Sequence, residues 1–256
     1  MSLSLTQYPR GPKARRFRVG DPLSMVLIVI TVVALVVAGL LGVELYGRHR
    51  AESAVIAATK CILQDNASVS FGPSPFLLQH LTGHYGNISI TTAGNQIRKA
   101  KGMKAYVRVN DVRLQSTVNS KGTIGALDAT ITWSSEGIKQ TLPNSIPLLG
   151  SFLSGVKTNP SAGTIQLRGM VGSITVKPEV GANGVGLQVV NLSGLGFMLP
   201  HESVQPALDL LADELTNNYP LGIHADSVRV TDSGVVGNFS TRNASIPRDN
   251  SCFAKL

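Results

Sequence analysis

Two histidines four residues apart come nearest to a catalytic metal site in this sequence. His80 and His84 stand in the run His-Leu-Thr-Gly-His. A zinc protease helix carries a glutamate directly after its first histidine, and this glutamate acts as the general base. Here Leu81 takes that position, and Gly83 weakens a helix. We therefore interpret both histidines as surface or capping residues and predict no metal site.

Other catalytic motifs are incomplete. Ser154 and Lys157 match the S-x-x-K pattern of penicillin-binding enzymes, but the sequence lacks the S-D-N and K-T-G motifs that complete that site. The glycines around Gly184 lack the strand–loop–helix setting of a nucleotide site. Neither Cys61 nor Cys252 has a neighbour in sequence that would make it a reactive thiolate. The sequence predicts no catalytic residue and no cofactor, and it favours a protein that is not an enzyme.

The two cysteines instead suggest a structural bond. An even number of cysteines is typical of disulfides in an oxidising compartment. A Cys61–Cys252 bond would close a loop of about 190 residues and stabilise the fold by about 4–5 kcal/mol in the chain-entropy model. We predict this disulfide; two unrelated buried thiols are the alternative.

Residues 23–43 form an apolar run without a charge. A helix of that length reaches about 32 Å, enough to cross the hydrocarbon core of a bilayer. Five basic residues and one acid precede the run, so the positive-inside rule places residues 1–22 in the cytoplasm. We expect a single-pass plasma-membrane protein with its main domain extracytoplasmic, in the periplasm. A signal peptide cleaved near residues 51–53 is the alternative, although the run is longer than a usual signal core.

Composition favours strands and turns in the rest of the chain. Glycine is abundant, with 26 residues, and the chain has only one tryptophan, five tyrosines and seven phenylalanines. The formal net charge is +8, but the N-terminal tail supplies half of it. The main domain is thus weakly basic, and we predict no nucleic-acid partner.

The pattern divides the chain into four parts. These are a cytoplasmic basic tail at residues 1–22, a transmembrane helix at 23–43, a helical stalk at 44–64 that becomes the first helix of the domain, and an extracytoplasmic domain at 65–256.

Within the domain, short strands alternate with turns. The strand at residues 104–117 changes its apolar phase, and we predict a bulge near Asn110. The apolar segment 146–156 is predicted to be helical, and residues 203–218 an amphipathic helix. The order of these elements predicts an α+β fold with a long, curved antiparallel sheet.

Two sets of residues are candidate binding sites. Apolar residues beside turns are expected to line an apolar cavity or its mouth: Phe76, Leu77, Leu78, Leu81, Tyr85, Leu148, Leu149, Phe152, Leu153, Phe197, Met198 and Leu199. Six clustered cations are expected to contact lipid headgroups or the membrane surface: Arg98, Lys99, Lys101, Lys104, Arg108 and Arg113. The alternatives are an ordinary core and a solvated strand edge. A lipid chain gains about 0.8 kcal/mol per buried CH₂, so binding needs no catalytic group.

The run Ser-Pro-Phe-Leu-Leu-Gln-His-Leu-Thr-Gly-His-Tyr at residues 74–85 resembles the signature of an actinobacterial envelope family. That family, formerly a domain of unknown function, includes the mycobacterial lipomannan elongation factor. Tyr-Pro-Leu-Gly-Ile at residues 219–223 resembles its C-terminal half, and the resemblance covers roughly residues 50–250. It implies a tubular lipid-binding-like fold, with a curved sheet wrapped around a long helix, and phospholipid binding without a catalytic motif.

These observations predict a membrane-anchored protein of the cell envelope that binds phospholipid or a lipoglycan precursor and supports lipomannan or lipoglycan assembly. The alternative is a non-enzymatic adaptor or scaffold for an envelope glycosyltransferase or another membrane enzyme. The expected partners are an envelope lipid, the plasma membrane and such a glycosyltransferase.

Overall fold

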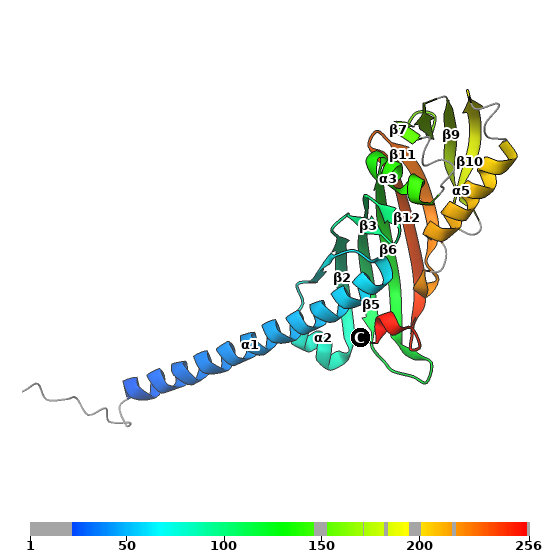
Figure 1. Cartoon of the computed structure of the whole chain (residues 1–256). Helices are drawn as coiled ribbons and strands as arrows, with labels where there is room; N and C mark the ends of the chain where they lie inside the picture. The colour runs from blue at the N-terminus through cyan, green and yellow to red at the C-terminus, as the bar shows by residue number, and fades with distance from the viewer. Residues whose placement is uncertain are drawn as a thin grey trace, which may run out of the picture. The chain divides into compact units, whose positions relative to one another are not determined.

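The computed structural model describes residues 22–145, 153–170, 172–181, 184–194, 201–216 and 219–254. The chain forms two compact units, Met1–Leu45 and Tyr46–Leu256. One unbroken helix, α1 (Pro22–Leu63), begins in the first unit and ends in the second (Figure 1). By length and composition, α1 is the one helix among the described residues that can cross a membrane. Its part in the second unit packs against the core through a stripe of apolar residues, Ala51, Val55, Ala58 and Ile62.

A six-stranded antiparallel sheet follows, in the order β1-β2-β5-β6-β12-β11. Its strands are β1 (Ala67–Phe71), β2 (His84–Thr92), β5 (Met103–Arg113), β6 (Ser120–Ser134), β11 (His224–Thr231) and β12 (Gly234–Pro247). Helix α2 (Phe76–Thr82) joins β1 to β2, and the hairpin of β3 (Gln96–Ile97) and β4 (Ala100–Lys101) precedes β5. One core joins this sheet to α1 and α2, with Phe71, Phe76 and Leu127 buried in it.

A four-stranded antiparallel sheet has the order β10-β9-β8-β7. Its strands are β7 (Leu153–Asn159), β8 (Thr164–Gly169), β9 (Ser173–Gly181) and β10 (Gly184–Ser193). Helices α3 (Ser135–Ser145) and α5 (His201–Thr216) pack against it, and α5 lies along β10 (Figure 1). A second core joins them, with Ile174, Leu208 and Leu211 among its buried residues. Two short 3₁₀ helices, η1 (Pro220–Gly222) and η2 (Ser251–Phe253), complete the chain. The predicted α+β fold with a large antiparallel sheet is confirmed.

The helix predicted over residues 146–156 is wrong where it can be compared. Residues 146–152 lie outside the described part, and Leu153 begins strand β7. Val156 pairs with Leu167 of β8, and both side chains join the second core. Cross-strand packing of these residues outweighs the helical spacing of the apolar run, because short apolar segments fit either structure.

In four neighbouring strands of the large sheet, the alternation of core-facing and outward-facing residues changes phase at one row of residues. The register of the strands places the four residues of this row next to one another: Gly86 of β2, Asp111 of β5, Gly125 of β6 and Asn243 of β12. Asp111 (φ 54°) and Asn243 (φ 51°) adopt the left-handed conformation, which these two residue types tolerate best after glycine. On either side of the row, residues three apart face the same core: Tyr85 and Ile88, Val109 and Val112, and Ile124 and Leu127.

The bulge predicted near Asn110 is therefore wrong, although the change of phase that suggested it exists. The register between β5 and β6 runs unshifted from Asn110 opposite Ala126 to Val112 opposite Ile124. A bulge shifts one strand against its neighbour, whereas here all four strands change together. Gly125 is required at the centre of the row, because a Cβ atom there would lie 2.8 Å from the Cβ of Asp111.

Candidate functional site

An apolar recess lies between the two sheets, beneath helices α3 and α5. The large sheet contributes one wall through residues such as Ile131, Val228 and Val235. The small sheet and α5 contribute the other through residues such as Leu167, Leu187 and Leu208. Nineteen of the described residues line the recess, and none of these nineteen is charged. A cleft with such walls is suited to a hydrocarbon chain.

The recess has a cavity volume of about 100 Å³, or about 890 Å³ when all the open space between its walls and at its mouth is counted. Two lining side chains carry polar tips, Trp133 and Tyr219. The Nε1 of Trp133 donates to the carbonyl oxygen of Lys101 at 2.9 Å, so the indole ring can face the recess with its polar atom satisfied.

Tyr219 connects the apolar walls to a cation. The guanidinium carbon of Arg98 lies 4.3 Å from the centre of the Tyr219 ring. Burial raises the pKa of the Tyr219 phenol above its usual value, and the charge of Arg98 offsets part of that rise. The side chain of Arg98 is half-buried. A positive charge therefore lies beside a residue of the recess wall.

The end of α1 positions Arg98. The Arg98 backbone N–H donates to the carbonyl oxygen of Leu63, the last residue of α1, at 2.8 Å. Gln96, on the same hairpin, donates its side-chain amide to the carbonyl of Gln64 at 3.0 Å. Ile97 and Ala100 then pack in a small core beside Met103, which lines the recess. The β3–β4 hairpin is thereby fixed between α1 and the recess.

Asp65 is the buried carboxylate at this junction. It accepts hydrogen bonds from the backbone N–H groups of Asn66, Gly94 and Asn95, at 2.9, 2.8 and 3.1 Å, and from the Asn95 side-chain amide at 3.0 Å. Burial alone would raise the pKa of this carboxyl, but the hydrogen bonds outweigh it, and the pKa of Asp65 is lower than usual. The ionised carboxylate thus binds the end of α1 to the loop that leads into the hairpin.

The six predicted headgroup cations spread over two places. Arg98, Lys99 and Lys101 belong to the hairpin beside the recess. Lys104, Arg108 and Arg113 follow along β5. Arg108 donates to the Tyr106 hydroxyl at 2.9 Å, and Arg113 pairs with Asp111 at 3.1 Å. Of the six cations, Arg98 has a contact with a residue of the recess wall, Tyr219, and headgroup binding by all six stays a prediction.

The predicted apolar lining residues are also dispersed. Phe76 and Tyr85 are buried in the core beside α1, Leu77 is half-buried, and Leu78 and Leu81 are exposed on α2. Leu153 packs against the second core. None of these six is among the nineteen lining residues. The other six lie outside the described residues: Leu148, Leu149, Phe152, Phe197, Met198 and Leu199. A lipid-contact role for this set stays a prediction.

The lining residues that sequence reasoning missed stand mainly on strands. Ile165, Leu167, Val176 and Val235 are the inward positions of alternating strands, and this pattern is the same for a filled core. Trp133, the single tryptophan of the sequence, was the available signal for the recess, since a large side chain with one polar atom often borders a binding site.

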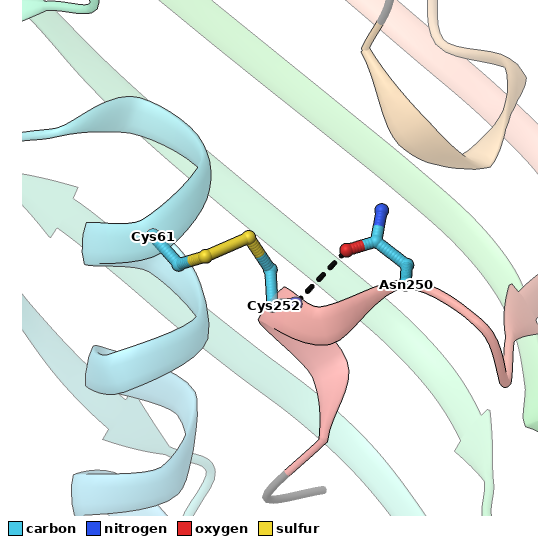
Figure 2. The surroundings of a disulfide bond; sticks show 3 residues. All are labelled: Cys61, Asn250 and Cys252. Carbon is cyan, nitrogen blue, oxygen red and sulfur yellow. Dashed lines mark hydrogen bonds between the residues drawn. A yellow bond between two sulfur atoms is a disulfide. The ribbon is translucent and has the colours of Figure 1, made fainter.

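The predicted disulfide joins Cys61 of α1 to Cys252 of η2 (Figure 2), and this prediction is confirmed. The two Cα atoms are 5.4 Å apart, and Cys252 follows Cys61 by 191 positions in the sequence. The Asn250 side-chain oxygen accepts from the Cys252 N–H at 3.0 Å and holds the turn in place (Figure 2). The C-terminal turn is thereby bonded to α1 two residues before that helix ends.

His80 and His84 each contact one nearby side chain. His80 Nδ1 lies 3.0 Å from the Tyr85 hydroxyl, and His84 Nε2 lies 2.6 Å from Asp111 Oδ1. Among the described residues, no group of three or more histidine, cysteine or acidic side chains is arranged to hold a metal ion.

Comparison with known proteins gives a family and close relatives. The sequence model of the LmeA-like phospholipid-binding family matches residues 38–240. Three proteins, described only as uncharacterized, from Mycobacterium bovis and two strains of Mycobacterium tuberculosis are each 53% identical to this chain over 252 residues. Each alignment covers 97% of this chain and 72% of the relative. No solved structure matches the chain. The family match spans most of the chain, including all nineteen described residues that line the apolar recess, and the chain therefore belongs to the LmeA-like phospholipid-binding family.

Proposed function

We propose that this protein is a membrane-anchored phospholipid-binding protein of the cell envelope, which holds an acyl chain in the recess between its two sheets. The observation that carries the proposal is the uncharged wall of that recess in a member of a phospholipid-binding family. Each CH₂ group taken from water into such a wall gains about 0.8 kcal/mol. Apolar contact is therefore a sufficient source of binding energy.

The hairpin cations give the bound lipid a direction. Arg98 borders the recess through Tyr219, and Lys99 and Lys101 are exposed on the same hairpin. A phosphate at this edge meets positive charge, while the acyl chain extends along the uncharged walls. We propose that Arg98, Lys99 and Lys101 contact the headgroup.

The anchor and its orientation are part of the same proposal. The apolar run of α1 crosses the plasma membrane, residues 1–22 stay in the cytoplasm, and residues 46–256 lie outside it. The unequal distribution of basic residues around the run supports this orientation. The Cys61–Cys252 disulfide supports it too, because such bonds persist in oxidising compartments.

We further propose that the protein presents lipid to envelope assembly and performs no chemistry on it. Lipid-linked sugar precursors share the acyl chains that the recess accepts, so lipoglycan assembly is the process in which this binding would be used. The protein would then deliver or position a lipid, and an envelope glycosyltransferase would act on it.

Photo-crosslinking of the full chain in vesicles tests the lipid site. The probe is a phospholipid with a diazirine on its acyl chain, and cross-linked residues are located by mass spectrometry. We expect cross-links on recess residues such as Leu187 in addition to those on the apolar run of α1. The α1 cross-links report lipid around the anchor and serve as an internal standard.

Val228→Trp is the variant that fills the recess. It should reduce recess cross-links about tenfold and leave the α1 cross-links unchanged. Val190→Trp is the matched control, because Val190 is 54% exposed and is not one of the lining residues. Equal recess labelling in the two variants would contradict the proposal. A recess without cross-links, in a protein that co-purifies with a glycosyltransferase, would favour the adaptor function instead.

A further inference from the structure

Helix α2 exposes two leucines on the surface of the second unit. Leu81 is 83% exposed and Leu78 is 59% exposed, although the helix has only seven residues. Its other side is well packed, since Phe76 and Gln79 are buried. The helix is thus held firmly by one face while the opposite face presents large apolar side chains to the surroundings.

The β5–β6 turn, which is bonded to the end of α2, also exposes apolar side chains. The Leu114 N–H donates to the carbonyl oxygen of Gly83, the residue that ends α2, at 2.9 Å. Leu114 is 36% exposed, and Val118, further along the same turn, is 85% exposed. We call Leu78, Leu81, Leu114 and Val118 the apolar rim.

Positive charge accompanies the apolar rim. The two stretches that carry it, residues 72–84 and 113–121, contain no aspartate or glutamate and include Arg113 and Lys121. Arg113 forms an ion pair with Asp111, which also contacts His84, and the Lys121 Nζ donates to the carbonyl oxygens of Phe253 and Ala254. Large apolar side chains with cations around them are the composition of protein surfaces that enter the interface of an anionic membrane.

Within the second unit, α1 contacts α2 and the loop before it. Gly47 packs against the ring of Phe76, since a Cβ atom at Gly47 would lie 3.2 Å from two ring carbons. Arg48 donates to the Gly72 carbonyl at 3.2 Å, in the loop that leads into α2. Gly47 is four residues after the end of the apolar run at Val43, which is about 6 Å along a helix. The headgroup layer on each side of a bilayer has about that thickness.

We propose that the apolar rim docks into the headgroup layer of the membrane that α1 crosses, so that the second unit has a membrane contact of its own. This inference rests on the proposed anchor and is separate from the lipid recess, because none of the four rim residues lines it. The occupant that we propose is a lipid surface rather than a protein, because Gly47, which contacts Phe76 of α2, follows the end of the apolar run by only four residues.

Depth-dependent fluorescence quenching of the full chain tests this docking. The native cysteines are bonded to each other, so a single introduced cysteine carries the dye. Leu81→Cys reports the rim. Met170→Cys is the matched control, because Met170 is 86% exposed and follows β8 of the small sheet. The vesicles contain an anionic phospholipid, with either a lipid-borne nitroxide or aqueous iodide as the quencher.

We expect the nitroxide to quench the Leu81 dye at least about threefold more than the Met170 dye, and iodide to show the reverse order. A Leu78→Asp substitution in the same chain should abolish this difference. Equal quenching at the two sites, in a chain that resists carbonate extraction, would overturn the docking and leave the anchor intact. A chain that carbonate extracts would overturn the anchor as well. Recess cross-links from the previous experiment remain a separate measurement.

Discussion

The guanidinium carbon of Arg98 lies 4.3 Å from the centre of the Tyr219 ring, so a cation and the wall of the apolar recess share one aromatic side chain. Stacking of this kind contributes about 0.5–2 kcal/mol, depending on its exposure to water. It also fixes the direction in which the guanidinium points. A flexible surface cation is thus converted into one that is held beside the recess.

Replacement of Arg98 should change which lipids bind. We expect Arg98→Gln to weaken cross-linking of an anionic phospholipid about fivefold, because a charge-assisted contact is lost, and to leave a zwitterionic lipid nearly unaffected. Competition between the two lipids in the photo-crosslinking assay measures this ratio. Arg168→Gln is the control, since Arg168 is an exposed cation on β8. An equal loss for both lipids would point to damage of the hairpin instead.

Removal of the disulfide should lower stability without removing the recess. For the double variant Cys61→Ala, Cys252→Ala we expect a loss of about 2–5 kcal/mol in the free energy of unfolding, because the unfolded chain gains freedom. Urea unfolding followed by the fluorescence of Trp133, the single tryptophan, gives the value. Lipid cross-linking in the absence of urea should persist. A variant as stable as the parent protein would show that the bond does not constrain the unfolded chain.

Asp65 should make stability depend on pH. Its pKa in the folded protein is lower than in the unfolded chain, so its contribution is complete above about pH 4 and is lost as the pH falls through the folded value. Asp65→Asn should therefore destabilise the protein by about 1–3 kcal/mol at pH 7. As the pH falls through the lowered pKa of Asp65, the two proteins should become more alike. Urea unfolding at several pH values tests this, and a pH-independent difference would contradict it.

The row across the large sheet should not accept a side chain at Gly125. For Gly125→Ala we expect a loss of about 1–3 kcal/mol, because the new methyl group meets Asp111. Gly155→Ala is the matched control on strand β7, where nothing lies within 4 Å of the added atom. The comparison uses thermal unfolding of both variants. Equal effects would mean that the close approach at Asp111 is relieved at little cost.

Patterns within one segment of the sequence predicted the elements that depend on that segment alone. The apolar run and the stripe from Ala51 to Ile62 specify α1, since both depend on spacing along one segment. Cys61 and Cys252 were the only two cysteines, so they had one possible pairing. The amphipathic stripe of α5 likewise lies in one segment, and Val204, Leu208 and Leu211 are buried as it requires.

Features that depend on several segments could not be derived in this way. The change of phase at Asp111 involves four strands. In the sequence of one strand alone, such a change has the same pattern as a bulge. The recess combines inward positions of both sheets with α3 and α5, and each of these positions alone resembles an ordinary core residue. The apolar run at 146–156 was ambiguous because its partner, β8, was needed to favour a strand.

The bond between Cys61 and Cys252 also determines how the protein responds to proteolysis. Together with the intervening chain it forms a covalent ring, which is attached through residue 60 to the rest of α1. A single cut anywhere within the ring leaves both fragments linked through sulfur to the same helix. Release of a fragment from the ring requires a second cut or a reductant. Damage to one loop therefore does not by itself shed any of these residues from the helix, and a nicked molecule can keep its two sheets together.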